Sequence, residues 1–419
     1  MMSIREELIS QAEAAKKAAR RLAKAGTNEK NKALNLIADK LLERQEEILE
    51  INEKDMQKGR NNDLSRALLD RLKLTESRIE GMAQGLREVA GQEDPIGEVP
   101  QMWKRPNGLQ IGKIRVPLGV IGIIYEARPN VTVDVAGLCL KSGNTVILRG
   151  GSNAFNSNQI LTNIIQDGLQ EAGLPKEAVQ LISTTDRKAV DILFTLNDYL
   201  DVLIPRGGAG LIQKVVNESK VPVIETGVGN CHVYVNKDAD LIKAKKIVFN
   251  AKYSRPAVCN AAESLLVDQE IAEEFLPEMA RIFAESDVEL RGCERTKKIV
   301  PNVKEAAEED YAAEYLDYIM SVKVVDNYEE AVEHIYQYGT KHSEAIVTEN
   351  YTTARAFLND IDAAAVYVNA STRFTDGGQF GLGAETGIST QKLHARGPMG
   401  LKELTTTKYI IMGDGQIRE

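Results

Sequence analysis

The chain has few cysteines: four among 419 residues, and no two of them form a CxxC pair. They are Cys139, Cys231, Cys259 and Cys293. None falls in a Cys/His cluster with the spacing of zinc ligands, and four thiols are too few for a disulfide framework. The sequence therefore predicts no metal site and a reducing, cytoplasmic environment.

Aromatic residues are also scarce, at 5% of the chain with a single Trp. Proteins that bind single-stranded nucleic acid need more aromatic side chains for base stacking. The 61 acidic residues outnumber the 52 Lys and Arg, giving a net charge of −9, whereas nucleic-acid binding depends on basic groups that neutralise phosphates. We therefore expect a small-molecule substrate and no nucleic-acid partner.

Long hydrophobic runs are missing as well. No apolar stretch approaches the roughly 18 residues of a membrane span, and the charged amphipathic N-terminus lacks the apolar core of a signal peptide. The 43% hydrophobic content is nevertheless ample for packed cores. We expect a cytoplasmic protein with no membrane partner and with two to three domains of roughly 150 residues each.

The first 91 residues predict helices, because their apolar residues recur at intervals of three and four. From residue 131, helical and strand-like segments alternate, and a second alternating block begins near residue 239. This alternation is typical of βαβ units, so we predict an α/β fold with parallel sheets. Ligands of such sheets bind at the carboxyl ends of strands.

Two β-like runs, 109–116 and 120–125, are separated by Pro117-Leu118-Gly119, which predicts a hairpin. A third β-like run, 405–412, lies near the C-terminus. Two strands alone are marginal in water. We therefore expect the hairpin and the tail to pack on another domain or subunit. The glycine-rich segment 374–398 is too long for an ordinary connection and predicts a functional loop.

Two glycine-rich turns follow predicted strands, Arg149-Gly150-Gly151-Ser152 and Arg206-Gly207-Gly208-Ala209-Gly210. Their backbone N–H groups could bind phosphates at helix N-termini, and ordinary strand-to-helix turns explain them equally well. No P-loop occurs, and no GxGxxG fingerprint follows the first parallel strand. The sequence therefore disfavours phosphoryl transfer from ATP.

Cys259 lies between a predicted helix and a predicted strand, four residues after Arg255. A half-exposed cysteine near a cation can act as a thiolate nucleophile, although a free cysteine is usually a small buried hydrophobe. The surroundings of Cys139 and Cys231 indicate core positions, and Cys293 reads as exposed. His394 is either an acid–base group or, with Lys392 and Arg396, part of a loop that faces an anion.

Several motifs together resemble the γ-glutamyl phosphate reductases, also called glutamate-5-semialdehyde dehydrogenases, of the aldehyde dehydrogenase superfamily. The resemblance runs from the N-terminal helices to the final YIIMGDG. The motifs are YEARPNVT at 125–132, VILRGGSN at 146–153, IPRGG at 204–208, ETGVGN at 225–230, SRPAVCN at 254–260 and GLGAETGISTQKLHARGPM at 381–399.

The resemblance implies an aldehyde dehydrogenase-like fold in three parts. These are a Rossmann-like cofactor-binding domain of residues 1–107, 127–240 and 390–403, an α/β catalytic domain of residues 241–389, and an oligomerisation arm of residues 108–126 and 404–419. We expect a homo-oligomer, a dimer or tetramer, and the resemblance leaves association with glutamate 5-kinase open.

The resemblance also implies that NADPH reduces L-glutamyl 5-phosphate to L-glutamate 5-semialdehyde and phosphate, a step of proline biosynthesis. It makes Cys259 the nucleophile that forms a thioester. Asn130 and the Cys259 N–H become the oxyanion donors. Glu225 lies where hydrolytic relatives carry a general base, and we expect a lesser role for it here.

The cofactor residues follow from the same resemblance. Relatives that prefer NAD commonly carry a Glu where this chain has Ser152, and a Lys where it has Arg149. A guanidinium with a hydroxyl can bind a 2′-phosphate, so we predict NADP(H). Glu314 resembles the carboxylate that binds the nicotinamide ribose. The predicted cofactor-binding residues are Arg149, Gly150, Ser152, Gly207, Gly208 and Glu314.

Two alternatives remain open. An ordinary NAD(P)-dependent aldehyde dehydrogenase that releases a free acid would share the fold and the cysteine. Three predicted substrate-binding arginines, Arg128, Arg255 and Arg373, favour the acyl-phosphate substrate, because guanidinium groups suit phosphate and carboxylate. A non-catalytic scaffold is the other alternative, and the presence of Cys259 with Asn130 argues against it.

Overall fold

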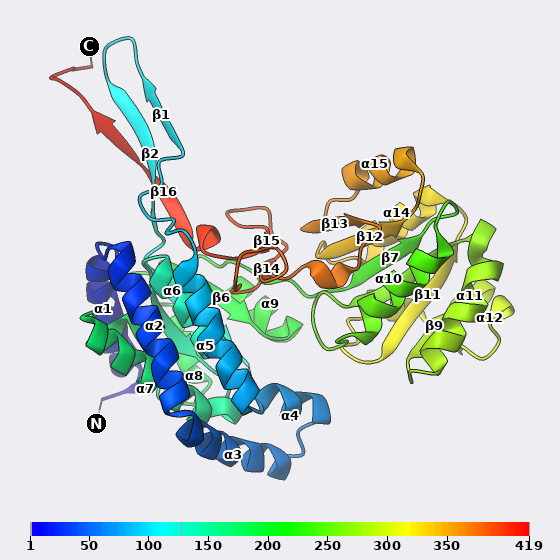
Figure 1. Ribbon diagram of the computed structural model, residues 1–419, viewed down its shortest axis with the longest axis horizontal. Helices are drawn as coiled ribbons and strands as arrows, with labels where there is room; N and C mark the ends of the chain where they lie inside the picture. Colours follow the sequence, from blue (N-terminus) through cyan, green and yellow to red (C-terminus); the bar gives the residue numbers. More distant parts are fainter. Residues whose placement is uncertain (1, 127, 419) are drawn as a thin grey trace. The chain divides into compact units, whose positions relative to one another are not determined.

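The computed structural model describes residues 2–126 and 128–418 and divides into two compact units (Figure 1). The first comprises residues 1–226, 381–387 and 399–419, and the second comprises residues 227–380 and 388–398. Within the described residues, no helix is both long and apolar enough to cross a membrane.

The first unit begins with the predicted helical region. Its apolar face is buried, as the spacing of three and four requires: Leu8, Ala12 and Ala15 of the first helix are at most 3% exposed. The helices are α1 (Ile4–Leu22), α2 (Thr27–Glu43), α3 (Gln45–Asn61), α4 (Arg66–Leu72) and α5 (Glu76–Gly91).

A four-stranded parallel sheet forms the centre of this unit, in the order β5-β4-β3-β6. The strands are almost wholly buried apolar runs, as expected for a parallel sheet covered on both faces. The strand order reverses beside β3, so the carboxyl ends of β3 and β6 form a topological switch point. The strands are β3 (Val120–Tyr125), β4 (Thr145–Arg149), β5 (Val179–Leu181) and β6 (Val202–Arg206).

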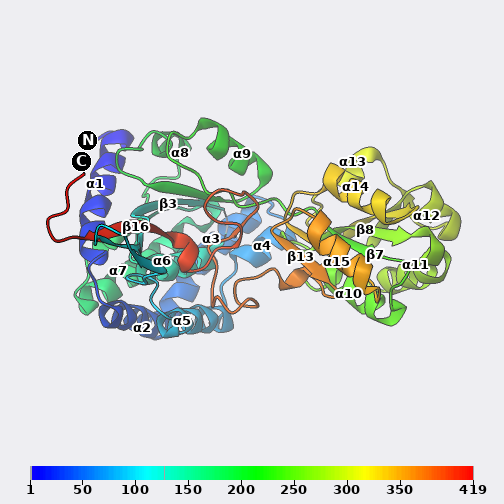
Figure 2. The same ribbon diagram turned by 90° about the horizontal axis from the view of Figure 1, so that it is seen from above.

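Helices cover both faces of this sheet (Figure 2). Helix α1 packs on one face together with α8 and α9. On the other face, α6 and α7 lie under α2 and α5, and Gly168 of α7 permits a close approach to Ile37 of α2. The connecting helices are α6 (Pro129–Lys141), η1 (Ser152–Ala154), α7 (Phe155–Ala172), η2 (Lys176–Ala178), α8 (Lys188–Leu193) and α9 (Ala209–Glu218).

The predicted hairpin of residues 109–125 is wrong. Strand β3 does not pair with the preceding β2 (Gln110–Pro117), because its buried apolar side chains belong to the parallel sheet. Strand β2 instead pairs antiparallel with β1 (Gln101–Lys104) and with β16 (Thr405–Met412), which brings the C-terminal tail beside it (Figure 1). We call this three-stranded sheet the arm.

The second unit contains a seven-stranded parallel sheet in the order β10-β9-β11-β8-β7-β12-β13. Strands β7, β8 and β12 all begin side by side at the amino edge of this sheet. The strands are β7 (Cys231–Val235), β8 (Ala262–Asp268), β9 (Glu289–Gly292), β10 (Lys304–Glu305), β11 (Ile319–Val325), β12 (Ser343–Val347) and β13 (Ala365–Val368).

Helices also cover both faces of the second sheet. Helices α10 and α11 pack on one face around Phe275 and Phe283, and α14 and α15 pack on the other around Phe357. The remaining helices of this unit are shorter. The bounds are α10 (Leu241–Tyr253), α11 (Gln269–Ala284), α12 (Glu294–Ile299), α13 (Glu308–Ala312), α14 (Tyr328–Tyr338), α15 (Tyr351–Asp360) and η3 (Thr372–Phe374).

The predicted domain bounds stay predictions, and the compact units change at other positions. The first change falls after Thr226 rather than at 240, because β7 pairs with β8 and β12 of the second sheet. Residues 388–398, including the paired β14 (Ile388–Ser389) and β15 (Gly397–Pro398), belong to the second unit. The short helix η4 (Lys402–Leu404) leads back into the arm. The expected bounds at residues 1, 127 and 419 lie outside the described residues.

Candidate active site

The switch point of the first sheet gathers residues from two turns. The N–H of Glu126, just after β3, donates to the carbonyl oxygen of Arg206 at the end of β6 (3.2 Å). Helix α6 then begins at Pro129, so Asn130 lies in its first turn. The Asn130 amide donates to the Asp134 carboxylate (2.9 Å), which fixes its orientation. Asn130 is therefore a half-buried, oriented N–H donor at the edge where parallel sheets bind ligands.

The second glycine turn lies at the same switch point. A Cβ on Gly207 would come within 2.8 Å of the Glu126 side chain, so the glycine lets this exposed side chain approach closely. Gly208 caps helix α9 and has open space around it, with residues 208–210 exposed. The N-terminus of this ten-residue helix therefore faces solvent and suits a diphosphate.

The first glycine turn is arranged differently. The carboxylate of the buried Asp55, on α3, accepts from the N–H groups of Asn156 (3.4 Å) and Ser157 (2.8 Å) at the start of α7. These helix N-terminal donors are already satisfied and are not available to a cofactor phosphate. A Cβ on Gly150 would lie 2.1 Å from the Asn158 amide, so this glycine serves close packing. Ser152, by contrast, is exposed.

Arg149 is largely held by the backbone. Its guanidinium donates to the carbonyl oxygens of Gly150 (2.7 Å) and Thr185 (3.1 Å), and the side chain is buried with its Nε unpaired. Burial, and then the positive charge of Arg187, lowers the pKa of Arg149. The exposed Arg187, in the turn between β5 and α8, is a residue that the sequence analysis missed. Its position in an ordinary polar turn gave no signal.

Cys259 lies in the connection between α10 and β8, at the amino edge of the second sheet, and is half-buried. A fully buried ion pair closes the base of this connection: the Lys252 ammonium lies 2.5 Å from the Glu263 carboxylate. Burial raises the pKa of the Glu263 carboxyl, and the Lys252 charge opposes that shift. The pair ties the end of the helix to the start of the strand and so restricts the loop that carries the thiol.

A second contact fixes the Cys259 backbone from the side. A Cβ on Gly229 would lie only 1.6 Å from the carbonyl oxygen of Cys259, so nothing larger than glycine fits. The Gly229 N–H donates to the Glu314 carboxylate (2.8 Å). Glu314 therefore supports the segment that packs on Cys259, and its predicted contact with a nicotinamide ribose stays a prediction.

Arg373 and Arg255 bring positive charge to the same loop. The Arg373 Nε donates to the Ser254 hydroxyl (3.0 Å), and its Nη1 donates to the side-chain oxygen of Asn260, the neighbour of Cys259. Burial, and then the charge of Arg255, lowers the pKa of Arg373. Two guanidinium groups beside a half-buried thiol create a local environment that attracts an anionic substrate.

The predicted site residues fall into two sets, one in each unit. Arg128, half-buried, caps α6, and Glu225 is half-buried before the end of the first unit. Their predicted roles stay predictions. The first unit also holds Asn130, Arg149, Gly150, Ser152, Gly207 and Gly208, and the second holds Arg255, Cys259, Glu314 and Arg373.

The cations of the loop around His394 share one carboxylate of the second unit. Lys392 and Arg396 both pair with the Asp362 carboxylate at 2.7 Å. Their hydrogen bonds, Lys392 first, lower the pKa of Asp362 to about 2. The single carboxylate offsets one of the two positive charges, so both interpretations of this loop stay open.

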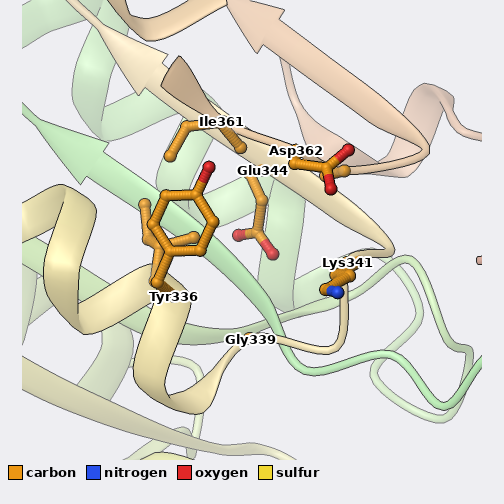
Figure 3. A pocket seen from close by; sticks show the side chains of 8 residues that line it. Tyr336, Gly339, Lys341, Glu344, Ile361 and Asp362 are labelled. Atoms are coloured by element: carbon orange, nitrogen blue, oxygen red, sulfur yellow. The ribbon is translucent and has the colours of Figure 1, made fainter.

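A separate pocket lies between the end of α14 and the connection from α15 to β13 (Figure 3). Its empty space, partly open to solvent, is about 260 Å³, and Tyr336, Lys341, Glu344 and Asp362 are among its lining residues. It contains none of the predicted catalytic, substrate-binding or cofactor-binding residues. It is therefore distinct from the site around Cys259.

Comparisons with known proteins show the family of the chain. The sequence model of the aldehyde dehydrogenase family matches residues 2–317. The γ-glutamyl phosphate reductase of Halothermothrix orenii is 69% identical over 418 residues, covering 100% of both chains. The γ-glutamyl phosphate reductase of Thermotoga maritima, whose crystal structure is known, is 53% identical with a TM-score of 0.95, covering 99% of this chain and 100% of that chain.

A more distant structure shows how widely the fold is shared. An acetylating aldehyde dehydrogenase from Geobacillus thermoglucosidasius is 19% identical, with a TM-score of 0.71 over 99% of this chain and 98% of that chain. The predicted α/β, aldehyde dehydrogenase-like fold is thus confirmed. On the full-length identity to its relatives and the family match, the chain belongs to the γ-glutamyl phosphate reductases, within the aldehyde dehydrogenase family.

Proposed function

We propose that the chain catalyses the reaction for which its family is named, with Cys259 as the nucleophile. L-Glutamyl 5-phosphate is reduced to L-glutamate 5-semialdehyde and phosphate, in proline biosynthesis. The observation that carries the proposal is the Cys259 loop: a half-buried thiol, held by the Lys252–Glu263 pair and by Gly229, with Arg255 and Arg373 beside it.

The reaction begins when the Cys259 thiolate attacks the γ-acyl carbon. The bond from that carbon to the phosphate oxygen breaks, phosphate leaves with the electron pair, and a thioester remains. A nicotinamide cofactor, when bound, would supply the hydride that reduces this thioester. The resulting thiohemiacetal collapses to the aldehyde, and the sulfur returns to Cys259 as a thiolate.

Both tetrahedral stages carry negative charge on the former carbonyl oxygen. The proposed donors are the Asn130 amide and the backbone N–H of Cys259. The hydrogen bond from Asn130 to Asp134 supports this role, because it orients the amide and leaves a second N–H for a ligand. A donor held in place before the reaction costs no reorganisation as charge develops.

The arginines favour an acyl phosphate over a neutral aldehyde. Arg373 is fixed by Ser254 and Asn260, while Arg255 is exposed beside it. A guanidinium held by hydrogen bonds and an exposed one suit the phosphate and the α-carboxylate of the substrate. In a hydrolytic enzyme, Glu225 would activate water for attack on the thioester. Inorganic phosphate needs less activation than water, so we assign Glu225 a minor role.

Phosphate dependence tests this proposal. In the oxidative direction, glutamate 5-semialdehyde and NADP+ are expected to give a steady rise in absorbance at 340 nm only when inorganic phosphate is present. Phosphate must release the acyl group from Cys259 before a second turnover. Equal steady rates with and without phosphate would instead support the hydrolytic aldehyde dehydrogenase.

The cofactor is proposed to be NADP(H). The open N-terminus of α9, after Gly207 and Gly208, suits the diphosphate. The exposed Ser152 hydroxyl and the exposed Arg187 lie beside Arg149, and the described residues include no carboxylate paired with either arginine. Two neighbouring cations without a counter-ion favour a dianionic 2′-phosphate. Arg187, rather than Arg149 alone, then supplies the mobile charge.

Ser152→Glu is expected to weaken NADPH binding by roughly 10- to 100-fold and NADH binding much less, because a carboxylate repels the 2′-phosphate. Arg187→Ala is expected to weaken NADPH selectively as well. Fluorescence titration of each variant with both cofactors measures the two dissociation constants. Lys188→Ala is the matched control, a neighbouring exposed cation without contact to Arg149. An unchanged NADPH/NADH ratio in both variants would refute this assignment.

The arm is proposed to join subunits in a homo-oligomer. Strands β1 and β16 are both edge strands of a three-stranded sheet, and edge strands readily pair with another chain. Several of its large apolar side chains are exposed, including Trp103, Tyr409 and Ile411, and such a patch is typical of an interface. Association with glutamate 5-kinase stays a prediction.

Deleting the residues after Leu404 is expected to reduce the assembly to smaller species in light scattering, because it removes β16 and one edge of the arm. Ile411→Lys tests the same surface without truncation, since Ile411 is 62% exposed and a charge there costs the single chain little. Lys408→Ala, on the same strand, is the control. An unchanged assembly size in both altered proteins would refute the role of the arm.

A further inference from the structure

A second cysteine lies directly against the residue that carries the nucleophile. Cys231 begins β7, and the Cys259 connection enters β8, the next strand of the sheet. The Cys231 thiol donates to the carbonyl oxygen of Cys259 (3.2 Å). Gly229, two residues before Cys231, is in contact with the same backbone. The two cysteines are therefore neighbours at the amino edge of the sheet, although 28 positions separate them in sequence.

A histidine lies next to the Cys231 thiol. The Cys231 Sγ is 3.7 Å from Nδ1 of His342, the residue before β12. Nδ1 also lies 2.8 Å from the Ser343 hydroxyl, which in turn is hydrogen-bonded to the Thr375 hydroxyl (2.7 Å). A buried polar network thus connects the thiol to the loop of Arg373. An imidazole nitrogen at this distance can take up the proton of the thiol as it reacts.

The two thiols differ in exposure. Cys259 is half-buried, whereas Cys231 is completely buried. Burial, and then the nearby Glu344 carboxylate, raises the pKa of Cys231 well above its ordinary value. The raised pKa keeps Cys231 protonated and protects it from direct oxidation, because oxidants react with thiolates. Cys231 would therefore react only with an electrophilic sulfur next to it.

We propose that Cys231 is a resolving thiol, which captures an oxidised Cys259 as an intramolecular disulfide and so protects the nucleophile from irreversible oxidation. The inference rests on the proposed function in one respect, namely that Cys259 is the reactive thiolate. No other residue of the proposed mechanism takes part. The oxidant is hydrogen peroxide or another hydroperoxide.

The chemistry balances in two steps. The Cys259 thiolate attacks one peroxide oxygen, an S–O bond forms, the O–O bond breaks, and hydroxide leaves; the sulfur is oxidised to sulfenic acid as the peroxide is reduced. Cys231 then attacks the Cys259 sulfur, an S–S bond forms and the S–O bond breaks. The departing hydroxide takes up the proton that His342 accepts from Cys231, giving water. A dithiol reductant restores both thiols.

The disulfide is tested directly by mass spectrometry of the full-length protein. Trypsin places Cys231 in the peptide 221–237 and Cys259 in the peptide 253–281, because the Arg255–Pro256 bond resists cleavage. After brief treatment with hydrogen peroxide and blocking of free thiols, a cross-linked pair lacking two hydrogen atoms is expected in the non-reduced digest. Dimedone, which traps sulfenic acids, is expected to label Cys259 weakly in the wild type and strongly in Cys231→Ala.

Activity provides the second measurement. Under reducing conditions Cys231→Ala and Cys231→Ser are expected to keep the wild-type rate. After excess peroxide, dithiothreitol is expected to restore most activity to the wild type and little to either variant, whose Cys259 proceeds to sulfinic acid. Two substitutions at this buried position keep the test valid if one of them misfolds.

Cys293→Ala is the control, because Cys293 is the other half-buried cysteine of this unit. Its thiol is hydrogen-bonded to Thr296 rather than to the Cys259 loop, so it is expected to recover like the wild type. Absence of the cross-linked peptide, or equal recovery of Cys231→Ala and the wild type, would overturn the inference. Neither result would affect the proposed function, which would fail instead if Cys259→Ser remained active.

Discussion

Replacing Cys259 with serine is expected to lower the rate of acyl-phosphate reduction by at least about 1,000-fold while leaving the fold intact. A serine hydroxyl is not ionised at neutral pH without an activating base, whereas a thiol is partly ionised. The structure supports normal folding, because the half-buried side chain lies in a loop outside both cores of the second unit. Initial rates at 340 nm and circular dichroism of the variant measure the two effects.

Three matched variants show whether the loss is specific. Cys139→Ala, Cys231→Ala and Cys293→Ala each remove one of the other thiols, and each is expected to retain the chemical step under reducing conditions. Cys139 is fully buried in the first unit, so its variant also shows how much a small cavity lowers stability without changing the site. Substantial turnover by Cys259→Ser would contradict the covalent mechanism.

Gly229→Ala is expected to have the next largest effect, lowering kcat by about 100-fold. The added Cβ would lie 1.6 Å from the Cys259 carbonyl oxygen and 2.6 Å from its Cα, so the nucleophile's loop must move. A displacement of about 1 Å is enough to cost this much in rate, because the reacting atoms no longer meet correctly. The expected signature is a loss in kcat with a much smaller change in cofactor binding.

The control for this variant is Gly85→Ala. Gly85 lies within helix α5 and has nothing within 4 Å of an added Cβ, so alanine there is expected to stabilise the helix slightly. The thermal unfolding midpoint separates the two causes of lost activity. Wild-type kcat in Gly229→Ala would show that the close contact does not position Cys259.

Periodicity and chemistry in the sequence predict most of the fold. Helices form within the first 91 residues, and strands alternate with helices after residue 131, as the pattern predicts. The strands are recognisable because a parallel sheet makes them continuous apolar runs. The predicted hairpin of 109–125 is wrong because the same apolar runs pair with distant strands. The proline and glycine of Pro117–Gly119 are typical of a hairpin turn. The pairing of β3 with β4 and β6 depends instead on contacts between residues that are far apart in the sequence.

The proposed nucleophile, Cys259, could be singled out from the sequence, and its surroundings could not. The local sequence gave Cys259 a cation at Arg255, and the resemblance to a known family added Asn130. Contacts such as Asp55 with the start of α7, or Gly229 with Cys259, join residues far apart in the chain. No periodic pattern marks them. Arg187 was missed for the same reason, because only folding brings it near Arg149.

The acyl group on Cys259 is the most direct test of the whole account. The protein is mixed with glutamate 5-semialdehyde and NADP+ without phosphate, quenched in acid and measured as intact protein and as the peptide 253–281. The account predicts a glutamyl adduct on Cys259 that accumulates without phosphate and disappears when phosphate is added. A protein that remains unmodified, or an adduct that clears equally fast without phosphate, would contradict it.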